Sequence, residues 1–195
     1  MQPAAADVAV VILAGGGATR FPGKLESDAG GVPLLLRVYR NVRSIGPVYV
    51  SANAPFGEAI ARELGCTIVP DLQAGRGPLG GIVSTFESVS QPLCFTIAGD
   101  APFVDRGVFD RLLAAWEPQL EAVAAERNGR LEPLCAIYSR EAFLREGRSE
   151  LAAGSGAVRA VVERLVHRRV GFPDERALAG INTIAERDAL LGLQL

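Results

Sequence analysis

Histidine is nearly absent from this 195-residue chain, in which His167 is the only one. Counting alone therefore excludes a His-based catalytic triad and a multi-histidine metal site, and it directs any metal chemistry to oxygen ligands. Cysteine is also scarce. Cys66, Cys94 and Cys135 are odd in number, widely spaced and set in apolar runs. We therefore expect buried, reduced thiols of a cytoplasmic protein rather than disulfides or metal ligands.

Long apolar runs and an excess of positive charge are missing as well. No segment is apolar for long enough to cross a membrane, and the N-terminal apolar run lacks the basic leader of a signal peptide. The formal net charge of −2 at pH 7 argues against a nucleic-acid surface. We therefore expect no membrane or nucleic-acid partner, and we expect a few local cations to hold any anionic substrate.

The composition is that of a globular protein with a substantial core, since 49% of the residues are hydrophobic. No repeat or linker divides the chain, so we expect one domain over residues 1–195. Strands and helices alternate through the first half. This pattern predicts an α/β fold with a doubly wound, mostly parallel sheet, a Rossmann-like three-layer sandwich with an antiparallel hairpin added late.

The stretch 8–25, VAVVILAGGGATRFPGKL, organises the rest of the chain. Residues 8–13 form a short β-branched run, which is typical of a strand buried on both faces. The glycines at 15–17 allow a sharp turn and a close approach of the backbone to a ligand. Arg20 and Lys24 follow. A buried strand, a loop of bare amides and two cations together predict an anion-binding site.

Two familiar phosphate motifs do not fit this loop. The Walker A pattern requires a glycine where Ala18 stands and a serine or threonine where Leu25 follows Lys24. The dinucleotide fingerprint requires a third glycine at the position of Arg20. The loop by itself leaves two interpretations open, an ordinary glycine-rich turn and a phosphate site of another kind.

Small polar residues follow two further strands. Residues 48–50 and 67–69 read as strands, and Asn53 and Asp71 come shortly after them. The carboxyl ends of parallel strands line the ligand crevice of an open sheet, so both side chains should face the glycine-rich loop. The alternative for each is a turn former or helix cap.

Four ordered strings of residues resemble one family. Together they are similar to the small-molecule nucleotidyltransferases and, within that superfamily, to the molybdenum cofactor guanylyltransferases (the MobA family). The resemblance covers nearly the whole chain. The strings are Leu13-Ala14-Gly15-Gly16 followed by Arg20 and Lys24, Gly77-Pro78-Leu79-Gly80-Gly81, Gly99-Asp100-Ala101-Pro102, and Gly180-Ile181-Asn182-Thr183.

The resemblance implies a reaction and its participants. The expected activity is transfer of GMP from GTP to molybdopterin or its molybdenum-bearing form, with release of pyrophosphate. Other cofactor-handling proteins are further expected partners. Residues up to about 104 would bind the nucleotide and those from about 105 would face the acceptor. The implied catalytic residues are Arg20, Lys24 and Asp100; the implied nucleotide-binding residues are Leu13, Ala14, Gly15, Gly16, Gly17, Lys24, Asn53, Asp71, Gly80 and Asp100; and the implied acceptor-side residues are Glu132, Pro133 and Asn182.

Asp100 is the expected metal ligand. Nucleotidyl transfer needs a divalent cation on the phosphates, and Mg²⁺ takes one or two carboxylates and keeps several waters. The alternative, that Asp100 caps the next helix, is better met by Asp105, which directly precedes the amphipathic segment 108–116. Asp71 is assigned to guanine, whose two adjacent N–H donors an ionised carboxylate can accept together.

Three features depart from the family pattern. The spacing between Arg20 and Lys24 is short, Val32 stands where the family often has lysine, and the segment 155–161 lacks a basic cluster. These departures affect the assignment of the acceptor more than the assignment of the nucleotide. The alternatives are a related transferase that uses CTP or a sugar or alcohol phosphate, and a nucleotide-binding regulator without turnover.

Overall fold

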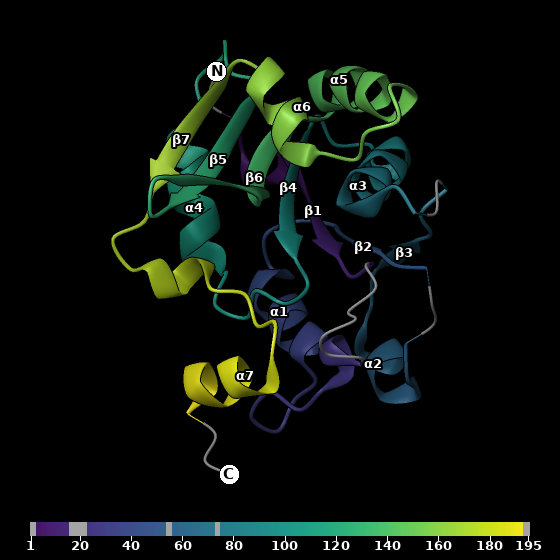
Figure 1. Ribbon diagram of the computed structural model, residues 1–195, viewed down its shortest axis with the longest axis vertical. Coiled ribbons are helices and arrows are strands. Elements are labelled where there is room, and N and C mark those ends of the chain that lie inside the picture. Colours follow the sequence, from purple (N-terminus) through teal and green to yellow (C-terminus); the bar gives the residue numbers. More distant parts are fainter. Residues whose placement is uncertain (1–2, 16–22, 54–55, 73–74, 193–195) are drawn as a thin grey trace.

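The computed structural model of the chain describes residues 3–15, 23–53, 56–72 and 75–192. Its centre is a seven-stranded sheet in the order β3-β2-β1-β4-β6-β5-β7 (Figure 1). Among the described strands, β6 alone runs against the others, so the predicted doubly wound, mostly parallel sheet is confirmed. The strands are β1 Val8–Leu13, β2 Val48–Ser51, β3 Thr67–Val69, β4 Leu93–Ala98, β5 Ala122–Arg127, β6 Arg130–Ser139 and β7 His167–Gly171.

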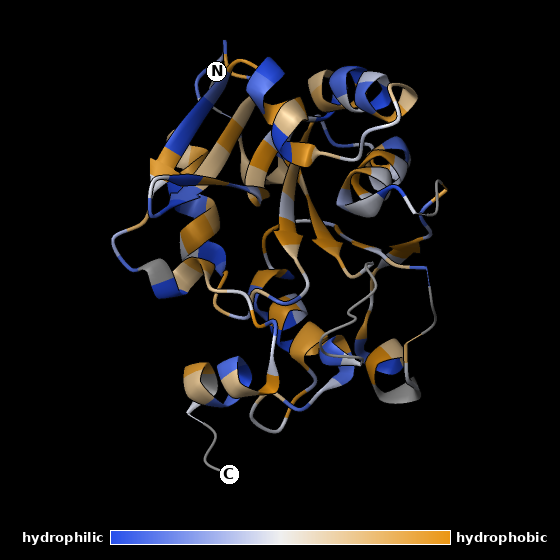
Figure 2. Cartoon of the chain, in the orientation of Figure 1, coloured by the Kyte–Doolittle hydropathy of each residue, from blue (hydrophilic) through white to orange (hydrophobic). Residues whose placement is uncertain are grey.

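Helices cover both faces of the sheet. One apolar cluster joins the sheet to α1, α2 and α4, and a second joins the opposite face to α3, α5 and α6. Figure 2 shows the contrast between the apolar central strands and the polar outer surfaces. No described helix is both long and apolar enough to span a bilayer. The helices are α1 Leu34–Val42, α2 Glu58–Glu63, α3 Gly77–Ser88, α4 Arg106–Ala114, α5 Arg140–Ala152, α6 Val158–Arg164 and α7 Ile184–Leu191.

Strand β1 is the centre of the core. All six of its residues are buried. Alternate side chains enter different clusters, because successive residues of a strand point to opposite faces: Val10 packs toward α1 and Val11 toward α3. The second cluster contains an aromatic group in which the rings of Phe86 and Phe143 lie 5.0 Å apart and those of Tyr138 and Phe143 lie 4.6 Å apart.

The strand order reverses at β1. The chain moves from β1 to β2 and β3 on one side and then returns to place β4 on the other. Leu13, the last residue of β1, pairs with Ser51 of β2 and with Ala98 of β4. Three strands therefore end level with one another, at the position where open parallel sheets form a ligand crevice.

Strands β5 and β6 form the late antiparallel hairpin that the sequence predicts. Asn128 and Gly129 have φ values of 52° and 70°, as a two-residue hairpin turn of this twist requires. The pairing jumps from Ala124 with Ala136 to Ala125 with Glu132, so residues 133–135 form a bulge. Strand β5 runs up to Arg127, directly before the turn.

The helix caps and the cysteines can be compared with the expectations from the sequence. Asp105 caps α4 as predicted and Thr183 caps α7, each accepting a backbone hydrogen bond at 3.1 Å. All three cysteines are free thiols, but Cys66 is only half-buried, which corrects the expectation for that residue because it lies just before an edge strand. Burial raises the pKa of the Cys94 and Cys135 thiols to about 12.

We expect Gly46→Ala to destabilise the fold. A Cβ at this position would lie 2.3 Å from the carbonyl oxygen of Val8, at the start of the central strand, so the backbone would have to shift. Overpacking of this kind costs about 1–3 kcal/mol of unfolding free energy, which urea denaturation measures. Gly171→Ala is the control, because no described atom lies within 4 Å of its Cβ position. Equal losses in the two variants would contradict the expectation.

Candidate functional site

A cavity of about 310 Å³ opens at the carboxyl ends of β1, β2 and β3. Its remaining wall is the first part of α3. Strand ends beside a switch point are where open α/β sheets bind their ligands, and this volume suits a small molecule. The residues that line it are Leu13, Gly15, Ser51, Asn53, Asp71, Gly75, Gly77, Pro78 and Gly81.

The carboxylate of Asp71 packs against α3 at Gly80. A Cβ on Gly80 would lie 2.9 Å from Oδ1 and 3.0 Å from Oδ2 of Asp71, so this approach requires glycine. Asn53 contributes to the same arrangement, since its Oδ1 accepts a hydrogen bond of 2.7 Å from the backbone N–H of Asp71. The structure thus brings together three of the residues that the sequence assigned to the nucleotide.

Ser51 is a lining residue that the sequence analysis missed. It is buried, and a Cβ on Gly81 would lie 2.5 Å from its Oγ. Its carbonyl oxygen accepts a hydrogen bond of 2.9 Å from the N–H of Ala14, which ties the start of the glycine-rich loop to β2. The adjacent glycines at 80–81 were the available signal, because two glycines inside a helix indicate a close approach on that face.

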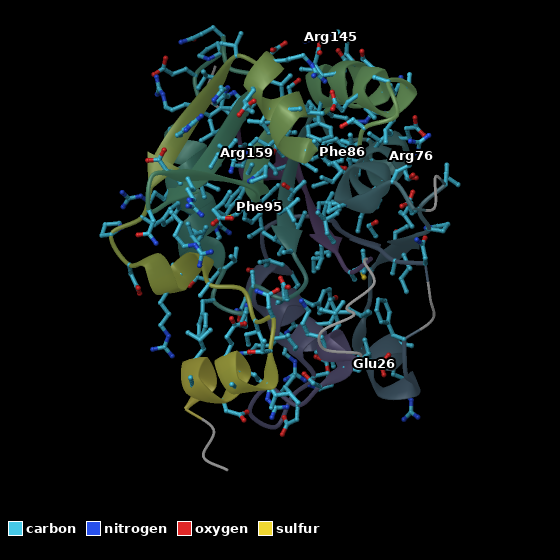
Figure 3. All side chains as sticks on the ribbon, in the orientation of Figure 1. Glu26, Arg76, Phe86, Phe95, Arg145 and Arg159 are labelled. Atoms are coloured by element: carbon cyan, nitrogen blue, oxygen red, sulfur yellow. The ribbon has the colours of Figure 1, made fainter. Side chains whose placement is uncertain are left out.

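Contacts from the second half of the chain hold the first turn of α3. Arg76, labelled in Figure 3, precedes this helix, and its Nη1 donates a hydrogen bond of 3.2 Å to the carbonyl oxygen of Gly154. A Cβ on Gly156 would lie 2.5 Å from the carbonyl oxygen of Arg76. The turn between α5 and α6 therefore packs directly on the helix end that walls the cavity.

Lys24 and Asp100 form an ion pair beyond the end of β1. The Lys24 ammonium donates a hydrogen bond to Oδ2 of Asp100. The two side chains are only 14% and 21% exposed, so water weakens their attraction less than it would at an open surface. The two predicted catalytic residues that the structure describes are thus in direct contact.

The loop that carries Asp100 is tied to its neighbours by backbone bonds. The N–H of Gly99 donates to the carbonyl oxygen of Leu13 at 2.9 Å, and the N–H of Ile181 donates to the carbonyl oxygen of Asp100 at 2.9 Å. Because Leu13 also lines the cavity, the ion pair and the cavity lie on either side of one strand end. The remaining predicted loop residues, Gly16, Gly17 and Arg20, lie outside the described residues.

The oxygen donors fit a cation that arrives with a nucleotide. In the described part of the chain, no three histidine, cysteine or acidic residues gather as a metal cluster. Asp100 supplies a carboxylate, the hard ligand that Mg²⁺ prefers, and Mg²⁺ commonly takes one or two carboxylates and completes its shell with water and substrate phosphates.

The residues predicted for the acceptor side lie in two places. Glu132 and Pro133 are at the β6 bulge, where Glu132 pairs with Arg127 at 3.0 Å and the buried Tyr138 hydroxyl donates a 2.6 Å hydrogen bond to the Pro133 carbonyl oxygen. Neither is among the described residues that line the cavity. Asn182 is exposed and follows the residue that binds the Asp100 carbonyl oxygen, so it lies beside the ion-pair loop.

Comparison with known proteins gives a consistent result. A family model described as a MobA-like NTP transferase domain matches residues 10–170. A molybdenum cofactor guanylyltransferase of Desulfosudis oleivorans is 30% identical over 187 residues, which cover 90% of each chain. A second one, of Burkholderia orbicola, is 31% identical over 203 residues, which cover 96% of this chain and 97% of the relative.

A solved structure shares the fold. Molybdopterin-guanine dinucleotide biosynthesis protein A from Archaeoglobus fulgidus superimposes with a TM-score of 0.75 and covers 95% of this chain and 97% of its own, at 23% identity. The family model matches most of the chain, and the two relatives, at 30% and 31% identity, align along nearly their whole length. This protein therefore belongs to the MobA-like NTP transferase family.

Proposed function

We propose that this protein transfers the GMP group of GTP to molybdopterin or its molybdenum-bearing form, releasing pyrophosphate and leaving a guanine dinucleotide cofactor. The observation that carries the proposal is the cavity at the switch point, with Asp71 on one wall and the Lys24–Asp100 pair just beyond the end of β1. The names of the relatives support the same reaction. We further infer that it acts in the cytoplasm, alongside other cofactor-handling proteins.

In this proposal the guanine base enters the cavity. Its two adjacent N–H donors meet the Asp71 carboxylate, which can accept both when ionised. The glycine-rich stretch 13–17 would then bind the sugar and the phosphates, because bare backbone amides are suited to anionic oxygens. Arg20 and Lys24 neutralise the phosphate charge. Asn53 contributes by holding the turn that carries Asp71.

In the proposal the Lys24–Asp100 pair opens when the substrate binds. In the proposal Asp100 holds Mg²⁺, which when bound neutralises charge on the phosphate oxygens. One carboxylate oxygen of Asp100 is engaged by Lys24 in the present structure. Lys24 therefore moves from the carboxylate to a phosphate as the nucleotide and its cation arrive.

The transfer itself is an in-line displacement at the α-phosphorus of GTP. A terminal phosphate oxygen of the acceptor forms the new P–O bond. The bond from the α-phosphorus to the bridging oxygen breaks, and pyrophosphate leaves with that electron pair. The attacking oxygen is already anionic, so the reaction needs no base and no covalent enzyme intermediate. The chain aligns the reactants and offsets the charge that gathers on the leaving group.

We place the acceptor on the side of Asp100 away from the cavity, near Glu132, Pro133 and Asn182. The pairing of β4 with β6 ends at Thr96 and Ala136, and beyond this point β6 bulges, so the described ladder leaves the end of β4 without a partner on that side. In this arrangement one domain has a nucleotide-binding half at about 1–104 and an acceptor-side half at about 105–195.

The first experiment compares nucleotides by thermal denaturation in the presence of Mg²⁺. GTP at about 100 times its Kd should raise the melting temperature by about 5–10 °C, and CTP at the same concentration should raise it less, because only a fitting ligand stabilises by mass action. A larger shift with CTP would favour the cytidylyltransferase alternative. Binding of GTP without pyrophosphate release on addition of molybdopterin would favour the regulator.

Lys24→Ala should slow the transfer step by about 100-fold or more, the size of effect seen when one charge-stabilising donor is removed. The measurement is single-turnover release of pyrophosphate at saturating GTP. Arg106→Ala is the matched control, since Arg106 is an exposed cation of α4 that forms an ion pair with Asp110 on the same helix. An undiminished rate in Lys24→Ala would contradict the assigned role.

Lys24→Ala should also bind a divalent cation better when no nucleotide is present. Removal of the lysine frees the carboxylate of Asp100, and a pair of this exposure is worth about 1 kcal/mol, or about fivefold in affinity. Free Mn²⁺, followed by its paramagnetic resonance signal, provides a readout that is separate from turnover. Asp100→Asn should lose the binding. Equal Mn²⁺ affinity in the wild type and Lys24→Ala would overturn the exchange of partners.

A further inference from the structure

The turn that carries Asp71 is anchored at two successive backbone amides. The N–H of Asp71 donates to Oδ1 of Asn53 at 2.7 Å, and the N–H of Leu72 donates to Oγ of Ser84 at 3.0 Å. Leu72 itself is 71% exposed, so burial of its side chain does little to hold the turn. The side-chain oxygens of Asn53 and Ser84 therefore help to hold this segment in place.

Ser84 is placed for this role by the helix. It lies four residues after Gly80, so the two positions share one face of α3. On that face, Gly80 presses against the Asp71 carboxylate while Ser84 holds the next residue of the turn. Ser84 is only 3% exposed and does not line the cavity in the described structure, so it reaches a ligand only through the turn.

The anchored turn determines how the Asp71 carboxylate is oriented. A carboxylate can accept two parallel hydrogen bonds from a flat base only when its plane is aligned with that base. Asp71 is limited by Gly80 on the helix side and by the two anchored amides on the backbone side. Release of the Leu72 amide would allow the turn to rotate, and the carboxylate would lose this alignment while keeping its charge.

We propose that Ser84 is a positioning residue for base selection: its buried hydroxyl aims the Asp71 carboxylate and thereby sets the preference for guanine. This inference rests on the proposed function, in which Asp71 accepts the base donors. Nucleotide specificity then depends partly on a buried residue of α3, and not only on side chains that contact the base directly.

The test compares GTP with ITP, whose base lacks the exocyclic amino group, by calorimetric titration with Mg²⁺ and no acceptor. One hydrogen bond to a charged acceptor is worth about tenfold in affinity, so the wild type should prefer GTP by about that factor. Ser84→Ala should reduce the preference to about twofold or less, mainly by weakening GTP. Alanine is a strong helix former, so the variant should keep α3 intact.

Ser88→Ala is the matched control. Ser88 lies one turn further along α3, is exposed, and donates a hydrogen bond of 3.4 Å to the carbonyl oxygen of Ser84. It should keep the wild-type preference. Equal weakening of GTP and ITP in Ser84→Ala would show a merely structural role and would overturn the inference, as would an unchanged preference.

Asp71→Asn separates this inference from the proposed function. If Asp71→Asn abolishes the preference while Ser84→Ala keeps it, the base-binding role of Asp71 stands and the positioning role of Ser84 falls. If the wild type shows no preference for GTP over ITP, the assignment of Asp71 to the base fails and the inference about Ser84 fails with it.

Discussion

The pairing of β1 with both β2 and β4 is the constraint on which the rest of the site depends. Leu13 lies in register with Ser51 on one side and with Ala98 on the other. This alignment brings a glycine-rich loop, the turn after β2 and the loop of Asp100 to the same edge of the sheet. The buried ladder of three adjacent parallel strands supplies the rigidity that a binding site on loops requires.

That edge contains two kinds of environment on either side of β1. On the β2 side, backbone and small residues form a close-fitting cavity in which Gly80 and Gly81 let the helix approach the strand ends. On the β4 side, a largely shielded cation and anion face each other. A flat heterocycle suits the first environment and a polyphosphate with its cation suits the second. In the proposed binding mode, the separation of base from phosphate would follow from the strand order, before any individual contact is considered.

Much of this arrangement could be predicted from the sequence, because it depends on local rules. Apolar β-branched runs mark the strands, and Asp105, Thr183 and the Asn128-Gly129 turn follow capping and turn chemistry that acts over a few residues. The missed features join residues far apart in the chain. Asn53 and Asp71 are 18 positions apart and Lys24 and Asp100 are 76 apart, so their partners depend on the packing of the sheet. The bulge at 133–135 was not predicted for the same reason, since the register of a strand depends on its partner strand as well.

The glycines of α3 have an effect that extends beyond the cavity. Gly80 and Gly81 lie inside this helix, and each lowers intrinsic helix stability by about 1 kcal/mol relative to alanine. The helix therefore depends on its packing in the second apolar cluster, which includes the aromatic group of Phe86, Tyr138 and Phe143. Affinity at the cavity and packing in this distant part of the core are thus thermodynamically linked. A screen for altered nucleotide binding would return substitutions among these buried rings, which touch no ligand at all.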